Sequence, residues 1–499
     1  MSAESQSGQI VRTRKGLVVA LSLALVVPCV WHRHIEAGDL GSHVYNAWLA
    51  QLIEKGQAPG MYIARQWNNV LVDWLMLHCA NLFGFAAAEK VVVSACVLIF
   101  FWGVFAFLSA VSGRPPWLLA PCIAMLAYGY SFNMGFLNYY VSLGLAALSL
   151  ALLWKGKGAR RIWGVLIVPF VILAHPLGLV WLAGVGLYVF LWTKLPRWWS
   201  SLLPVVAVLG LIAMRWYLAH RVKFPVAWSD TPPYVLNGAD QLMLYRERYV
   251  WLAWAAVIFG VISFLLGLRA SCGDDTFLKR LFLPAQLYAI AFCATALLPN
   301  DLRPSLYEGW IGLLVFRLTT VSAIFGLCVL ACCKFSKWHL AGFSVIAVLF
   351  FGFLHQDTRD INVMESNAAK LFAGLPYGTR VIPTIVAPED SRIEFIGHSL
   401  DRACIGHCFT YSNYEPSSGQ FRVRAGKGSP IATDSADDSS DMESGAYEVQ
   451  DTDPPLVQIY QCDVADWKRL CLHSLAVGDT TGRLGLHEAP EWNSGDPAK

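Results

Sequence analysis

Two polar side chains directly after the first apolar segment stand where they could act on a substrate. Asp39 and His43 are one helical turn apart, and residues 42–54 have the spacing of an amphipathic helix. A carboxylate within hydrogen-bond reach of a hydroxyl can accept its proton as a general base. Asp39 also stands close to where a helix N-cap would be, so capping of that helix is the alternative interpretation. The sequence leaves both open.

Three basic side chains near the ends of apolar segments are candidates for an anion site. Arg317 falls about eight residues, roughly 12 Å, inside its segment. An unpaired arginine at such depth costs at least ~2.5 kcal/mol, so it needs a partner. A phosphate would serve, and so would an ion pair with Asp73 or a snorkelling head group. His175 and Arg215 end two other segments on the same side, where interfacial residues are also common.

Amide, aromatic and charged side chains suited to a sugar substrate occur at two places. Asn133, Asn138 and Tyr139 join two apolar segments, and Glu415 and Arg422 lie in a later polar stretch. Aromatic faces beside amides suit sugar rings. A membrane-interface aromatic belt is the alternative for the first group, and an exposed hairpin is the alternative for the second.

Four of the thirteen cysteines lie in the polar tail, namely Cys404, Cys408, Cys462 and Cys471. The others lie in or beside apolar segments, where cysteine serves as a small hydrophobic residue. We expect the four to form two disulfides, with a metal site involving His407 as the alternative. Since only three residues separate Cys404 from Cys408, we expect each to reach across the domain rather than to the other.

The composition indicates that a membrane positions these residues. Hydrophobic residues make up 56% of the 499, charged residues make up 15%, and the mean hydropathy is +0.47. These values lie outside the range typical of soluble domains, so membrane lipids are the main surroundings. The net charge of +3 comes without a basic face, which excludes a nucleic-acid partner. No nucleotide-binding glycine loop and no Gly-x-Ser-x-Gly motif occurs.

Apolar runs of sufficient length predict about eleven transmembrane helices. The runs are 16–33, 90–112, 116–131, 136–154, 160–175, 177–195, 199–219, 249–268, 281–298, 309–331 and 337–354. Basic clusters such as Lys155 to Arg161 place residues 1–15 in the cytoplasm and the tail outside. Residues 68–84 are interrupted by Asp73 and His78, and we interpret them as a half-inserted segment of a long outer loop, 34–89.

The tail, 356–499, has the pattern of a small α+β domain. Helical spacing over 365–372, strand patterns at 380–386 and 456–460, and frequent turn residues predict it. An acidic flexible loop is expected near 426–454. The predicted fold class is therefore an α-helical polytopic membrane protein, with a transmembrane domain over 16–355 and a small C-terminal extracytoplasmic domain.

This arrangement resembles the C-type glycosyltransferase (GT-C) fold. The shared features are an acidic residue past the first helix, here Asp39, an amphipathic helix, and an apolar half-helix ending in Phe83-Gly84. Many spans and a trailing outer domain follow. Protein O-mannosyltransferases and the lipid A aminoarabinose transferase have this fold, and the resemblance covers about residues 16–355. The chain departs from those transferases at 67–71, where Trp-Asn-Asn-Val-Leu replaces their Pro-Pro-Leu run, so the donor and acceptor classes stay open.

The resemblance implies a multi-pass glycosyltransferase in the cytoplasmic membrane of a bacterial cell envelope. A sugar would pass from a polyprenyl-phosphate donor to a lipid, glycan or protein acceptor at the outer face. Asp39 and His43 would act in catalysis, and Arg317, His175 and Arg215 would hold the donor phosphate. The sequence specifies no cofactor and leaves a divalent cation open. A transporter and a non-catalytic scaffold displaying its tail are the alternatives.

Overall fold

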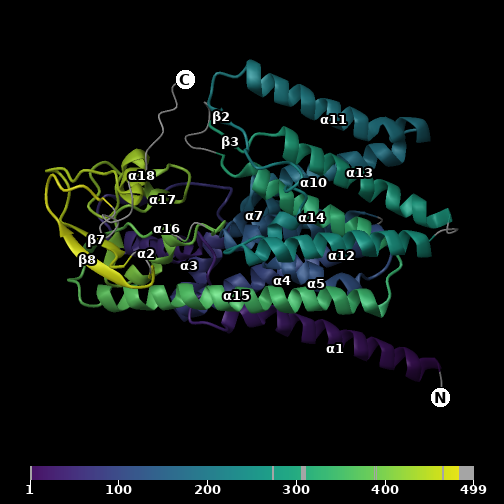
Figure 1. Cartoon of the computed structure of the whole chain (residues 1–499), viewed down its shortest axis with the longest axis horizontal. Coiled ribbons are helices and arrows are strands. Elements are labelled where there is room, and N and C mark those ends of the chain that lie inside the picture. The colour runs from purple at the N-terminus through teal and green to yellow at the C-terminus, as the bar shows by residue number, and fades with distance from the viewer. Residues whose placement is uncertain are drawn as a thin grey trace.

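The computed structural model describes residues 3–154, 156–271, 275–304, 311–386, 388, 390–463 and 466–482. Long helices run side by side in a bundle, and the C-terminal strands gather at one end together with α2 and α3 (Figure 1). The N-terminus lies at the opposite end of the bundle. The start of α1 and the strands of the tail are therefore at opposite ends of the bundle.

Seven described helices are long and apolar enough to cross a membrane. They are α4 (Phe85–Ser112), α10 (Pro176–Lys194), α11 (Arg197–His220), α12 (Arg248–Ala270), α13 (Asp275–Leu297), α14 (Leu314–Cys332) and α15 (Lys337–Phe372). The most apolar stretch of α11 has no buried residue. Apolar side chains on the outside of the molecule are what a bilayer requires, so the chain is a multi-pass helical membrane protein.

The other predicted spans have a shorter apolar stretch, as in the 15–30 part of α1, or are broken into several helices. They comprise α1 (Ala3–Val30), then η1 (Trp117–Leu119), α5 (Ala120–Ala127) and α6 (Tyr130–Asn133), then α7 (Leu137–Leu153), and finally α8 (Ala159–Leu166) with α9 (Val168–Ala174). Proline lacks a backbone N–H, and Pro169 follows the break between α8 and α9. Because these helices are not among the seven long ones, the predicted number of eleven crossings belongs to the topology proposed below.

Residues 34–89, which we call the first outer loop after their predicted position, contain α2 (Leu40–Glu54), β1 (Met61–Ile63) and α3 (Leu71–Phe83). With 13 residues, α3 is about 20 Å long, against about 30 Å of bilayer core. A straight α3 cannot cross a membrane. The half-inserted segment predicted for 68–84 stays part of the topology proposed below.

The tail contains strands and short helices. They are β4 (Thr379–Pro383), α16 (Ile396–Ser399), η3 (Arg402–Cys404), β5 (Cys408–Thr410), α17 (Tyr414–Ser417), β6 (Val423–Ala425), α18 (Ala436–Ser444), β7 (Leu456–Gln461) and β8 (Leu470–Leu475). The main sheet has the order β5-β4-β7-β8, with β4 parallel to β5 and β7, and β8 antiparallel to β7. The strands predicted at 380–386 and 456–460 are confirmed as β4 and β7.

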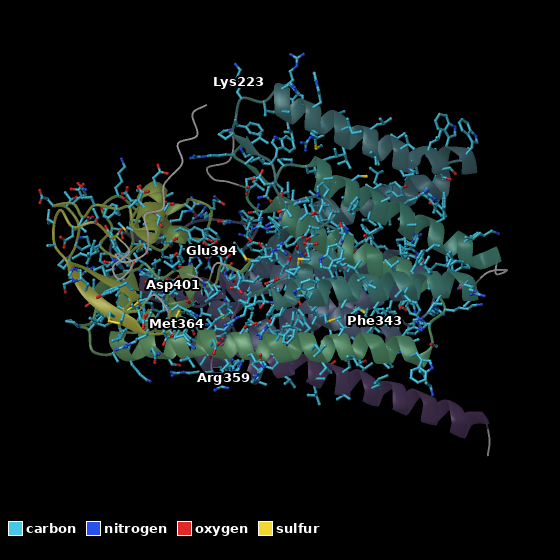
Figure 2. All side chains as sticks on the ribbon, in the orientation of Figure 1. Lys223, Phe343, Arg359, Met364, Glu394 and Asp401 are labelled. Atoms are coloured by element: carbon cyan, nitrogen blue, oxygen red, sulfur yellow. A yellow bond between two sulfur atoms is a disulfide. The ribbon has the colours of Figure 1, made fainter. Side chains whose placement is uncertain are left out.

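The tail is joined to the first outer loop by a pair of strands and to the bundle by a continuous helix. Strand β6 pairs antiparallel with β1, which lies more than 350 residues earlier in the chain. Helix α15 carries buried Phe343 in the bundle and buried Met364 beside the tail, so it runs without a break through the boundary expected at 356 (Figure 2). Two further short elements, η2 (Ala239–Leu242) and the β2–β3 pair (Val226–Ala227 with Asp301–Leu302), lie in later loops.

The acidic segment 426–454 is not wholly the flexible loop that its composition predicts. Residues 436–444 form α18, and the hydroxyl of Ser435 accepts a hydrogen bond from the N–H of Asp438 at 3.1 Å. Asp437 and Asp438 lie in the first turn, where negative charge interacts favourably with the helix dipole. The expectation was wrong because capping and dipole effects stabilise a helix in spite of the polar composition.

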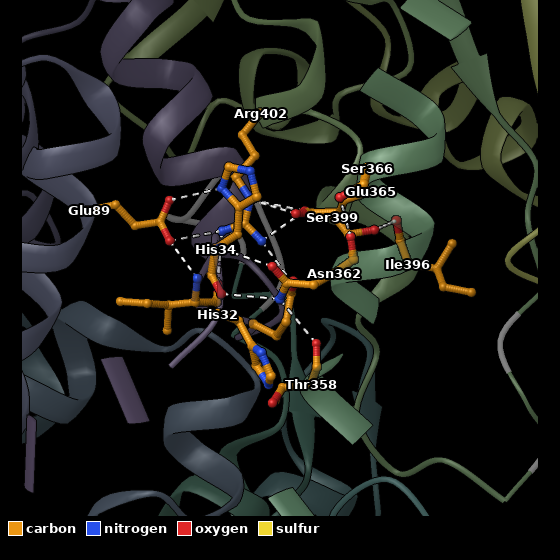
Figure 3. Close-up of polar contacts among 12 residues, drawn as sticks. His32, His34, Glu89, Thr358, Asn362, Glu365, Ser366, Ile396, Ser399 and Arg402 are labelled. Atoms are coloured by element: carbon orange, nitrogen blue, oxygen red, sulfur yellow. Dashed lines mark hydrogen bonds and ion pairs between the residues drawn. The ribbon is translucent and has the colours of Figure 1, made fainter. Parts of the chain in front are cut away.

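A buried ion cluster joins the tail to the bundle (Figure 3). Arg402 Nη2 lies 2.8 Å from Glu36 Oε2 and 2.8 Å from Glu365 Oε1, and its Nη1 lies 3.5 Å from Glu89 Oε1. Asn362 donates to Glu36 Oε1 at 2.5 Å. Burial and the charge of Glu365 raise the pKa of Glu36, whereas Arg402 lowers it. We call these five residues the Arg402 cluster, and they join the first outer loop, α4, α15 and η3.

Candidate functional site

Asp39 occupies the N-cap position of α2, but its carboxylate does not cap the helix. Its backbone N–H donates to the carbonyl of Met134 at 3.3 Å. A Cβ on Gly135, whose φ is +78°, would lie 2.3 Å from that nitrogen, so only glycine allows this approach. Among the described residues the Asp39 carboxylate has neither an ion-pair partner nor a hydrogen-bond donor. The backbone is therefore held while the carboxylate is left available.

His43, one turn further along α2, is held by an acidic residue of α3. Its Nδ1 lies 2.6 Å from Asp73 Oδ1, and Asn138 donates to the other Asp73 oxygen at 2.9 Å. Burial opposes a charged imidazole, but Asp73, with smaller contributions from Glu415 and Asp39, raises the pKa of His43 to about 10. His43 is thus a positively charged hydrogen-bond donor at neutral pH and cannot serve as a base.

Arg317 lies in the first turn of α14, so the depth expected from the sequence was wrong. Helix α14 begins at Leu314 because Leu313 has the left-handed φ of +51° and ends the preceding extended segment. The guanidinium stacks on Phe136, 4.3 Å from the ring centre, and does not pair with Asp73. Its Nε is buried without a hydrogen-bond partner in the described structure. Its charge also interacts with that of Asp39.

The tail brings a second imidazole toward Asp39, which our sequence interpretation missed. His398 Nδ1 lies 2.9 Å from Asp401 Oδ2, and its ring centre is 4.9 Å from that of Tyr414. Burial lowers its pKa, but Asp401 and then Asp39 raise it, to about 10. A Cβ on Gly41 would lie 2.0 Å from the carbonyl oxygen of His398, which shows how closely α2 meets the tail. The His-x-x-Asp spacing was the one local signal for this pair.

Glu415 and Arg422 line a small cavity together with Asp73. The cavity is about 20 Å³ and is also lined by Asn46, which suits a single water and no sugar ring. Asn46 donates to Glu415 Oε2, and Glu415 Oε1 is buried without a partner among the described residues. Burial raises the pKa of Glu415 to about 7, although His43 lowers it. The predicted contact of Glu415 and Arg422 with a sugar is not supported by this placement.

The predicted sugar-binding residues of the first group are buried in structural hydrogen bonds. Asn133 donates to the carbonyls of Tyr128 and Gly129, and its oxygen accepts from Tyr245. Tyr139 donates to the carbonyl of Arg317 at 2.6 Å, while Asn138 holds Asp73 as described above. These residues therefore position the neighbours of Asp39 rather than present a surface to a substrate.

The side chains of His175 and Arg215 also make hydrogen bonds with the backbone. His175 Nδ1 accepts from the N–H of Leu177 at 3.1 Å and so caps α10. Arg215 donates to the carbonyl of Ala296 at 3.4 Å and stacks over Trp228 at 4.0 Å. It lies on α11, apart from α2 and α3 (Figure 1). The structure does not bring Arg215 to Asp39.

The tail cysteines form two local disulfides, Cys404–Cys408 and Cys462–Cys471. The expectation that Cys404 and Cys408 would each reach across the domain was wrong. The intervening turn contains Gly406 at a φ of +83°, which lets the chain fold back between η3 and β5. Within the described ranges no group of three or more His, Cys, Asp or Glu side chains could hold a metal ion.

The charge of Asp39 therefore interacts with those of Arg317, His43 and His398, which come from three separate parts of the chain, and both histidines are imidazolium ions at neutral pH. No family model, no curated protein and no solved structure matches the chain. Any function must be argued from the geometry of these four residues.

Proposed function

We propose that this protein is a membrane glycosyltransferase that moves a sugar from a polyprenyl-phosphate donor to an acceptor at the outer face of the membrane. The observation that carries the proposal is the Asp39 carboxylate. It stands at a helix N-terminus without capping it, and its charge interacts with those of His43, Arg317 and His398. An unpaired carboxylate whose charge interacts with those of three cations suits a reaction that both removes a proton and releases an anion.

In the proposed reaction Asp39 takes the proton of an acceptor hydroxyl. At the same time the oxygen of that hydroxyl forms a bond to the anomeric carbon of the sugar. The bond from that carbon to the phosphate oxygen breaks, and the electron pair leaves with the polyprenyl phosphate. Positive charge must stabilise the departing phosphate. Arg317 is assigned this role because its Nε has no partner in the described structure. His43 and His398 supply further positive charge and N–H donors.

The proposed topology has eleven crossings, with the N-terminus in the cytoplasm and the tail outside. The seven long helices supply most of the crossings, and the basic cluster between α7 and α8 favours the cytoplasmic side. The two tail disulfides suit a compartment outside the cytoplasm. The tail-side ends of the helices would then meet a donor carried in the outer leaflet.

The test is transfer of labelled sugar from a panel of polyprenyl-phosphate donors, measured on the full chain in lipid nanodiscs. Asp39→Asn keeps the size of the side chain and removes the basic oxygen, so transfer should fall by about 10²-fold or more. Asp451→Asn, at an exposed turn, is the matched control and should retain activity. Thermal unfolding of both variants should match that of the wild type.

Two outcomes would end the assignment. Full transfer by a folded Asp39→Asn protein would show that Asp39 is not the base. Absence of transfer by the wild type from every donor in the panel would favour the scaffold that displays its tail.

A further inference from the structure

A basic cleft lies between the end of α1 and the tail-side part of α15, away from Asp39. It has a volume of about 300 Å³, and its lining includes His32, Arg33, Arg359, Ser366 and Lys370. Figure 2 shows Arg359 on α15, close to where α1 ends. The volume is at the lower end of the range for small-ligand pockets.

The three cations of the cleft have no acidic partner. Within the part of the chain that the structure describes, Arg33, Arg359 and Lys370 form no ion pair and no side-chain hydrogen bond, and all three are exposed. The nearby acidic residues of α15 point elsewhere. Asp357 pairs with Arg246 and Arg248, and Asp360 pairs with Arg246 and Lys468. The cleft therefore carries uncompensated positive charge.

The cleft lies where the two helices leave the apolar layer. Helix α1 exposes Leu23, Val27 and Val30 up to its end, and α15 exposes Val345, Val348 and Leu349 before the cleft. Trp31 then packs edge-on against His355, with ring centres 5.1 Å apart. Tryptophan at the end of an apolar helix is typical of the membrane interface. Arg33 and Arg359 thus lie close to the level of lipid head groups, just beyond apolar surfaces suited to acyl chains, and Lys370 lies further along α15.

We propose that this cleft binds the phosphate of an anionic phospholipid in the leaflet on the tail side. The neighbouring apolar faces of α1 and α15 favour a lipid over free phosphate. Asp39 is not among the residues that line the cleft, and Asn362, which does line it, donates to Glu36 of the Arg402 cluster. A bound head group would bridge α1 and α15 next to the cluster that holds the tail.

The experiment measures lipid binding by the full chain in nanodiscs of phosphatidylcholine with added phosphatidylglycerol, using native mass spectrometry. The wild type should retain phosphatidylglycerol in preference to phosphatidylcholine. The triple variant Arg33→Gln, Arg359→Gln, Lys370→Gln should bind it at least about tenfold more weakly, since each surface cation contributes ~1 kcal/mol to attraction of an anionic lipid. The matched control neutralises three exposed lysines elsewhere, Lys55, Lys223 and Lys427, and should bind as the wild type does.

Three results would overturn the proposal. The first is equal retention of the two lipids by the wild type. The second is an equal loss in the cleft variant and the control, which would mean attraction by net charge alone. The third is displacement of the lipid by millimolar inorganic phosphate, which would assign the cleft to the free ion. None of these readouts depends on glycosyl transfer.

Discussion

The Nδ1 atom of His43 lies 2.6 Å from the carboxylate of Asp73, a contact that joins the two helices of the first outer loop. A similar pair, His398 and Asp401 at 2.9 Å, joins α16 to η3 in the tail. In both pairs the carboxylate stabilises the protonated imidazole, and both imidazoles interact with the charge of Asp39. The charge around the candidate site therefore depends on two protons.

Because the folded protein holds these two protons, we expect it to lose stability at alkaline pH. Both pKa values are raised from 6.5 to about 10 in the folded protein, so the folded state holds two protons that the unfolded state loses above about pH 6.5. Their stabilisation is complete below pH 6.5 and is lost as the pH rises through 10. The melting temperature should fall between pH 7 and pH 10. It should fall less in the double variant His43→Gln, His398→Gln, and an equal slope in that variant would contradict the assignment.

Asp39→Ala should leave the stability of the protein almost unchanged. A capping carboxylate would cost about 1 kcal/mol on removal, but this one makes no capping hydrogen bond. Ser435→Ala is the comparison, because the Ser435 hydroxyl does cap α18. Its loss should cost about 1 kcal/mol. Chemical denaturation of the two variants measures their free energies of unfolding. A greater loss for Asp39→Ala than for Ser435→Ala would restore the capping interpretation.

Arg402→Met should destabilise the contact between the tail and the bundle strongly. The change leaves Glu36, Glu89 and Glu365 buried together without their cation, and breaking a buried pair costs about 3–5 kcal/mol. Arg246→Met is the matched control, because Arg246 pairs with Asp357 at 3.2 Å but is 45% exposed. In limited proteolysis the tail of Arg402→Met should be cut sooner than that of the wild type or of Arg246→Met. Adding Glu36→Gln to Arg402→Met should restore part of the resistance to proteolysis, since it removes one of the unpaired negative charges.

Gly41→Ala should displace the tail from α2. The new Cβ would lie 2.0 Å from a backbone oxygen of His398, which cannot move without moving α16. Both the melting temperature and sugar transfer should fall. Gly186→Ala in α10 is the control, because nothing lies within 4 Å of a Cβ there. Normal transfer and stability in Gly41→Ala would show that His398 is not needed near α2.

Cysteine labelling tests the proposed orientation. In a chain whose free cysteines are replaced, Ser417→Cys should react with an impermeant maleimide from outside, and Gly158→Cys only after the membrane is opened. The expectation rests on the basic cluster at 155–161. Labelling of Gly158→Cys in sealed cells would reverse the topology and place the candidate site in the cytoplasm.

Local patterns were sufficient to predict the membrane character, the long helices and the two central strands of the tail. Hydropathy over about 20 residues and alternation over five or six are properties of contiguous sequence. The same patterns placed Asp39 at the start of α2. The charge bias of the loops was the reason to predict that 68–84 does not span. They also overestimated the depth of Arg317, because a turn at Leu313 has no hydropathy signal.

The membership of the candidate site was decided only by the tertiary structure. His398 and Arg317, whose charges interact with that of Asp39, lie hundreds of residues from it in the chain, and Asn46 reaches Glu415 across 369 positions. The partners of buried charges are chosen by which surfaces pack together, since each charge must find its counter-charge wherever the fold brings one. Composition and spacing therefore revealed which residues could do chemistry, while packing of the tail on the first outer loop determined which of them stand together.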